Sequence, residues 1–78
     1  MDEKITLIAA GTEITVTAGD NADYIKALVD NFNEDVTEMQ ISHTKATKIE
    51  AIIMCALNYL DDKKKLEAEV IKLRNGRA

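Results

Sequence analysis

Two short stretches near the start of the chain alternate apolar and polar residues. Apolar side chains stand at every second position from Ile5 to Ala9 and again at Ile14 and Val16, with Ala10-Gly11-Thr12 between them. A period of two is typical of strands with one buried face. Gly11 gives the backbone freedom that a tight turn needs. The pattern predicts a β-hairpin, which needs another element to cover its apolar face.

After Ala18-Gly19 the apolar spacing changes to steps of three and four residues. Asp20 is placed to cap a helix whose backbone amides need an acceptor. Residues 40–46 are polar and are expected to form a connector. The pattern predicts an amphipathic helix packed on one side only. Its apolar stripe is Ile25, Leu28, Val29, Phe32, Val36 and Met39.

A third segment, from Thr47 to Leu73, contains neither Gly nor Pro. Thr47 and Glu50 have the spacing of a capping box, which indicates that a helix begins there. A helix of about 27 residues is roughly 40 Å long, whereas a compact chain of 78 residues is only about 30 Å across. We therefore expect this helix to project from the rest of the protein.

The first half of this helix is apolar nearly all round, and the second half narrows to a seam of coiled-coil type. A helix that is apolar nearly all round is buried on more than one side. A chain this short usually needs disulfides, a metal or oligomerisation to be stable. Cys55 is the single cysteine, so no disulfide within the chain supplies one. We expect an oligomer interface at Ile49, Ile52, Ile53, Ala56, Leu57 and Leu60, extended by Leu66, Val70 and Leu73.

Together these elements predict an α+β fold: an N-terminal β-hairpin, an amphipathic helix and a long C-terminal helix that projects as a coiled coil. We expect one structural domain, with a ββα head at 1–46 and a long dimerisation helix at 47–78. The assembly is expected to be a homodimer or a tetramer.

Charge and composition exclude several function classes. The net charge is −4, and residues 1–45 carry nine acidic residues against three lysines, so this part should repel nucleic acid. The apolar run Ala51–Leu57 is far shorter than a membrane span, and the polar, acidic start is unlike a signal peptide. We expect a cytoplasmic protein that binds neither nucleic acid nor membrane.

Catalytic chemistry has few candidates in this sequence. Cys55 lies within the apolar part of the long helix, where a thiol is more often a small core residue than a nucleophile. His43 lies in the polar connector, with no other His or Cys at metal-ligand spacing. We therefore expect no catalytic residues, no metal and no cofactor.

One stretch of the long helix resembles a family signature. Ala56-Leu57-Asn58-Tyr59-Leu60-Asp61-Asp62 is similar to the Ala-Leu-Asn-x-x-acidic-acidic signature of the cell-division protein ZapA family. The alternating stretches around Gly11 resemble that family's opening hairpin, and Tyr24 to Met39 resembles its first helix. Asn58 either makes a hydrogen bond that fixes the register or holds the hairpin, or it presents an exposed amide, and the sequence leaves both alternatives open.

The resemblance implies a non-enzymatic cell-division accessory protein at the division site. Members of the family bind filaments of the tubulin-like GTPase FtsZ, self-associate as dimers or tetramers and cross-link the filaments into bundles. Some longer members carry basic residues at contact positions that this chain fills with Thr12, Gln40 and Thr44. The resemblance therefore implies partner contacts at those three positions, within a head that is acidic.

Other classes of function compete with this interpretation. A generic cytoplasmic coiled-coil adaptor that scaffolds another protein would share the same architecture. A small nucleic-acid-binding dimer would use the basic cluster Lys63–Lys65, and a thiol enzyme would use Cys55.

Overall fold

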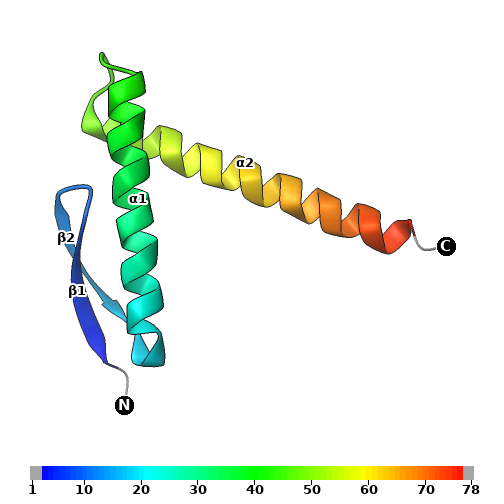
Figure 1. Ribbon diagram of the computed structural model, residues 1–78, viewed down its shortest axis with the longest axis horizontal. Coiled ribbons are helices and arrows are strands. Elements are labelled where there is room, and N and C mark those ends of the chain that lie inside the picture. The colour runs from blue at the N-terminus through cyan, green and yellow to red at the C-terminus, as the bar shows by residue number, and fades with distance from the viewer. Residues whose placement is uncertain (1–2, 77–78) are drawn as a thin grey trace.

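The computed structural model describes residues 3–76. Two strands, β1 (Lys4–Ala9) and β2 (Thr12–Thr17), are followed by the short 3-10 turn η1 (Gly19–Asn21) and two helices, α1 (Ala22–Ser42) and α2 (Lys48–Asn75). Figure 1 shows the hairpin lying along one side of α1, while α2 projects away from the hairpin. The predicted α+β fold, a hairpin followed by two helices, is confirmed.

The hairpin has one apolar and one mixed face. Its antiparallel register pairs Ile5 with Val16 and Leu7 with Ile14, and all four side chains are half-buried on the side that packs on α1. The opposite face is open to solvent. A two-stranded sheet is marginal in water, so α1 is what makes this hairpin stable.

The hairpin turn is held by a side chain from α1. Ala10 and Gly11 both have positive φ, 50° and 81°, as a two-residue type I′ turn requires. The Ala10 N–H donates to Oδ1 of Asn33 over 2.7 Å, and Nδ2 of Asn33 donates to the carbonyl of Ile8 over 3.0 Å. One half-buried amide thus ties the turn to the middle of α1.

The start of α1 differs from the sequence prediction. Asp20 does not cap the helix but lies inside η1, and the N-cap residue is Asn21, whose side chain makes no capping hydrogen bond. The backbone of this corner is held differently, because the N–H of Ala18 donates to the carbonyl of Glu3 and that of Asn21 to the carbonyl of Ala18. The Asp20 prediction is therefore wrong, and η1 replaces the side-chain cap.

The buried core is small and lies where α1 crosses the beginning of α2. Val36, Ala51 and Cys55 are almost inaccessible to solvent. Ala10, Phe32, Met39 and Ile52 pack around them and are partly buried. The predicted stripe of α1 is only partly covered, since Leu28 is 48% exposed.

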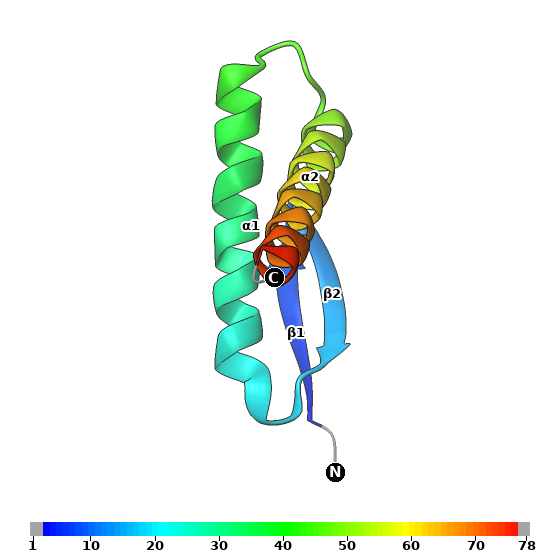
Figure 2. The same cartoon turned by 90° about the vertical axis from the view of Figure 1, so that its right-hand side faces the viewer.

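The overall shape is extended and flat. The radius of gyration is 16.3 Å and the principal extents are 49 × 44 × 14 Å, whereas a compact chain of this length has a radius of gyration near 11–12 Å. Figures 1 and 2 show why: α2 leaves α1 as a free-standing arm. We call β1, β2, η1 and α1 the head.

Candidate functional site

Local sequence fixes both ends of α2. The hydroxyl of Thr47 accepts the N–H of Glu50 over 3.1 Å, and the Glu50 carboxylate accepts the N–H of Thr47 over 3.0 Å. The predicted capping box is thus confirmed, and these bonds lower the pKa of Glu50, the one from the Thr47 backbone contributing most. At the other end, the N–H of Gly76 bonds the carbonyl of Lys72. The arm is a continuous helix of 28 residues.

One side of the first half of α2 is apolar and uncovered. Four large side chains follow one another at helical spacing and are between 48% and 70% exposed. The head covers a different side of the helix, the one that carries Ala51 and Cys55. We call this set the proximal face: Ile49, Ile53, Leu57 and Leu60.

The second half of α2 exposes a seam formed by Leu66, Val70 and Leu73, which we call the distal seam. Leu66 and Leu73 follow Cys55 by 11 and 18 residues, about three and five full turns. The distal seam therefore continues the side of α2 that the head covers, and not the proximal face. The nine residues expected at one interface lie on two sides of the helix.

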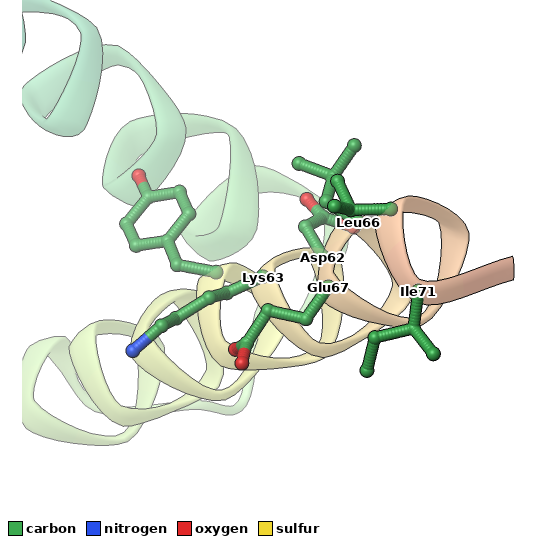
Figure 3. A pocket seen from close by; sticks show the side chains of 7 residues that line it. Asp62, Lys63, Leu66, Glu67 and Ile71 are labelled. Carbon is green, nitrogen blue, oxygen red and sulfur yellow. The ribbon is translucent and has the colours of Figure 1, made fainter. Parts of the chain in front are cut away.

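A groove of about 580 Å³ runs along the distal seam. Leu66, Val70 and Ile71 line it together with Tyr59, Asp62, Lys63 and Glu67. Figure 3 shows Leu66 and Ile71 on different sides of the helix, while the long side chains of Lys63 and Glu67 extend back along it. Its lining thus combines three aliphatic side chains with three charged ones and a tyrosine.

Two further residues of the expected interface belong to neither the proximal face nor the distal seam. Ile52 packs partly against the core of its own head, because it stands next to Ala51 on the side that faces α1. Ala56 is exposed beside the proximal face. Ile52 thus contributes to the fold of the single chain as well as to any surface between chains.

A polar contact marks the point where α2 leaves the head. The hydroxyl of Tyr59 donates to Oδ2 of Asp35 over 2.5 Å. The ring of Tyr59 lies 6.4 Å from that of Phe32, tilted by 52°. Burial and the neighbouring Asp35 carboxylate raise the pKa of Tyr59, so its phenol keeps the proton it donates.

Cys55 and His43 lie in surroundings typical of a core cysteine and a surface histidine. Cys55 is buried, and burial, with a smaller effect of Asp35, raises the pKa of its thiol, whereas a nucleophilic cysteine needs a lowered pKa. His43 is exposed at the C-cap of α1, with Nδ1 3.3 Å from the carbonyl of Met39. Among residues 3–76, no three His, Cys, Asp or Glu side chains are arranged to hold a metal ion.

Comparison with protein families gives one match, which covers nearly the whole chain. Residues 5–77 match the family described as cell division protein ZapA. This chain belongs to the ZapA family. Neither the curated proteins nor the solved structures that were compared with it include a match.

Membership of the ZapA family confirms the resemblance stated from the sequence and identifies a cell-division protein associated with FtsZ. The family is one of non-enzymatic, division-site proteins. In the part of the chain that is described, neither helix is long and apolar enough to cross a bilayer.

The residues of the ZapA-like signature lie on α2 around the point where it leaves the head. Leu57 belongs to the proximal face, and Asp61 makes an exposed ion pair of 2.8 Å with Lys65. Asn58 is exposed, and its amide makes no hydrogen bond to any described residue. Asn58 and Asp62 both line a crevice between α1 and α2 that also contains Asp35 and Tyr59.

The three positions implied as partner contacts come from three elements. Thr12 begins β2, Gln40 lies in the last turn of α1, and Thr44 lies in the connector to α2. Thr12 and Thr44 are exposed and Gln40 is half-buried. In Figure 1 the hairpin turn lies beside the middle of α1, whereas the connector lies at the C-terminal end of that helix. Their role in binding stays a prediction.

Sequence reasoning missed Asn33 and Asp35. Both lie within the amphipathic helix, and neither belongs to the apolar stripe predicted for it. A signal was present for Asn33, which stands four residues after Val29 and three before Val36 and so borders the buried side of the helix. Asp35 carries no such signal, because its partner Tyr59 is 24 residues away.

Proposed function

We propose that this chain is a non-enzymatic accessory protein of cell division that self-associates through α2 and cross-links FtsZ filaments at the division site in the cytoplasm. The observation that carries this proposal is the uncovered apolar surface of α2. Every described residue from Ala56 to Gly76 is exposed. The distal seam lies within that stretch, and the proximal face begins one to two turns before it and continues into it.

The amount of exposed surface supports self-association. The accessible surface of the chain is 6513 Å², whereas a compact monomer of 8.6 kDa exposes about 4700 Å². The excess of about 1800 Å² is within the range that each partner buries in an obligate dimer. A second copy is the simplest partner, because a two-fold axis lets one apolar surface cover its own equivalent.

The arrangement also supports a bivalent mechanism. We propose that the ββα head, residues 1–46, binds the filament and that residues 47–78 join the heads. A symmetric oligomer then presents each head at least twice, and the second contact gains from a high effective concentration. Such a protein bundles filaments and stabilises the division ring without any reaction.

The proposed filament contacts are Thr12, Gln40 and Thr44, the positions that correspond to basic contact residues in some longer family members. None of the three is charged here, and the surrounding head is acidic. On this proposal, hydrogen bonding rather than positive charge makes the contact. Binding should then depend less on ionic strength than a contact between opposite charges would.

Self-association is tested with a matched pair of variants. Ile53 on the proximal face and Ile8 on the outer face of β1 are similarly exposed, at 52% and 61%. We expect Ile53→Lys to place a charge in the subunit contact and to reduce the mass found by light scattering to that of one chain. Ile8→Lys, which faces Glu13 across the hairpin, should leave the mass unchanged. An intact oligomer in Ile53→Lys, with a normal circular dichroism spectrum, would contradict the interface.

Filament binding is tested by sedimenting the protein with FtsZ and GTP. The wild type and Ile8→Lys should pellet with filaments and increase light scattering as bundles form. A protein that self-associates but stays in the supernatant would instead be a coiled-coil adaptor for another partner. Ile53→Lys, which should not self-associate, is expected to bundle no filaments, and its circular dichroism spectrum shows how much helix is lost together with the oligomer.

A further inference from the structure

The packed contact between the head and α2 is narrow and lies near one end of the helix. Val36 on α1 meets Ala51 and Cys55 on α2, and these are the buried residues of the core. The two on α2 have small side chains that are one turn apart, so the helices touch over a short length. A contact of this kind resists separation better than it resists rotation, because few atoms lie far from its centre.

Tyr59 makes the contact that lies furthest out along α2. It stands one turn beyond Cys55, and its hydroxyl reaches Asp35, the neighbour of Val36 on α1. Its ring also lies against Phe32, one turn earlier on α1. Among residues 3–76 no residue beyond Tyr59 makes a side-chain hydrogen bond or ring contact to the head.

A phenol that donates to a carboxylate makes a short, charge-assisted hydrogen bond, stronger than one between neutral groups. Asp35 is half-buried and Tyr59 is 41% exposed, so the bond is only partly screened by solvent. Since the pKa of Tyr59 is raised, the donor stays protonated in neutral solution. The donor proton that this bond needs is therefore in place in neutral solution.

We infer that Asp35 and Tyr59 form an elbow clasp that sets the direction in which α2 leaves the head. Val36, Ala51 and Cys55 act as the pivot, and the clasp prevents rotation about it. From Tyr59 to Asn75 the arm extends by 16 residues, about 24 Å, so a rotation of about 10° moves its end by about 4 Å. Asp35 and Tyr59 are positioning residues: they orient the surfaces on α2 without forming them.

The consequence for filament bundles rests on the proposed function. If α2 joins two heads, its direction sets how far apart and at what angle the two heads stand. The clasp would then determine the spacing between cross-linked filaments. A change in elbow angle should alter that spacing without altering the affinity of a single head.

The clasp is tested on the intact protein by residual dipolar couplings of backbone amides, which report the relative orientation of α1 and α2. In the wild type both helices should fit one alignment tensor. In Tyr59→Phe, which keeps the ring on Phe32 and removes only the hydroxyl, we expect the two helices to need different tensors. Tyr24→Phe is the matched control, because Tyr24 is exposed on α1 and its hydroxyl bonds no described residue.

A second pair of variants separates the clasp from general stability. Asp35→Ala removes the acceptor and should reproduce Tyr59→Phe, with no further change in the double variant, because the two residues act as a unit. Asp35→Asn keeps an acceptor oxygen and should retain most of the wild-type orientation. The melting temperature and the oligomer mass should change little in all of these variants. One shared tensor in both Tyr59→Phe and Asp35→Ala would overturn the clasp.

Electron microscopy of FtsZ bundles then tests the link to function separately. Altered spacing with Tyr59→Phe, but not with Tyr24→Phe, would support both the clasp and the cross-link. An altered elbow with unchanged spacing would leave the clasp standing and contradict the bivalent arrangement of heads. The residual dipolar couplings can therefore overturn the clasp, and electron microscopy can separately overturn the bivalent cross-link.

Discussion

The two halves of α2 belong to one uninterrupted helix, yet they differ in what holds them in place. The first half begins with a capping box and buries Ala51 and Cys55 against α1. From Ala56 onward every described residue is exposed, including Leu66, Val70 and Leu73. The first half is stabilised by its own chain, and the second half keeps its apolar seam without any intramolecular cover. The fold of one chain therefore explains the apolar residues in the first half of α2 that pack on α1, but not the apolar residues of the distal seam.

This contrast also separates folding from assembly along the sequence. Substitutions near Ala51 should act on the head of each chain, whereas substitutions on the proximal face and the distal seam should act between chains. Substitutions of the two kinds can be compared for their effect on stability. Each is measured at one fixed chain concentration, because the stability of an oligomer depends on it.

The strongest test makes the same change in both halves of α2. Ala51→Leu forces a larger side chain into the closest contact with α1 and should lower the free energy of unfolding by about 1–3 kcal/mol. Ala68→Leu, on the exposed second half, should change it by less than about 0.5 kcal/mol. Urea unfolding followed by circular dichroism gives both values. Equal effects would mean that the two halves are covered alike.

The next test concerns the tie between hairpin and α1. Asn33→Ala removes the acceptor of the Ala10 N–H and the donor to the Ile8 carbonyl. Leaving these groups without a partner should cost about 1–2 kcal/mol, and amide exchange in the hairpin should become faster. Asn31→Ala, an exposed asparagine on the same helix, is the control. Unchanged exchange at the turn in Asn33→Ala would show that the tie is not needed.

The smallest expected effect is at the start of α2. Thr47→Ala removes the N-cap and should cost about 1 kcal/mol of stability, while Thr44→Ala in the connector should cost little. The cap also predicts a dependence on pH. The folded pKa of Glu50 is lowered from 4.5, so its contribution is present above that value and is lost as the pH falls through the lower folded pKa. Acid titration by circular dichroism should show that component in the wild type and not in Glu50→Gln, which has no carboxylate to titrate, while Thr47→Ala should keep part of it because the backbone N–H of residue 47 remains.

Local signals in the sequence predicted much of this fold. The alternation around Gly11 predicted the hairpin, and the spacing of Thr47 and Glu50 predicted the first turn of α2. Both structures depend on residues within a few positions of each other, so local sequence is enough to predict them. The start of α1 was misplaced at Asp20, since a 3-10 turn held by backbone bonds to Glu3 and Ala18 supplies what a side-chain cap would. That arrangement depends on the path of the chain around the corner.

The candidate site was predictable only in part. The apolar residues of α2 were identified, but they were expected to form one surface. The helix carries two, because Leu66 and Leu73 lie on the same side as Cys55, which the head covers, and the proximal face lies on another side. The roles of Asn33 and Asp35 depend on partners more than 20 residues away. Such pairs become visible only when the helices are placed against each other, and a periodic pattern along one helix does not contain them.

The central claim is that one copy of this chain leaves too much apolar surface exposed to stay folded alone. Light scattering combined with circular dichroism, over a dilution series through the micromolar range, tests it most directly. We expect a mass of at least two 8.6 kDa chains and a loss of helix signal as dilution separates them. A helical species with the mass of a single chain, stable across the whole series, would contradict it.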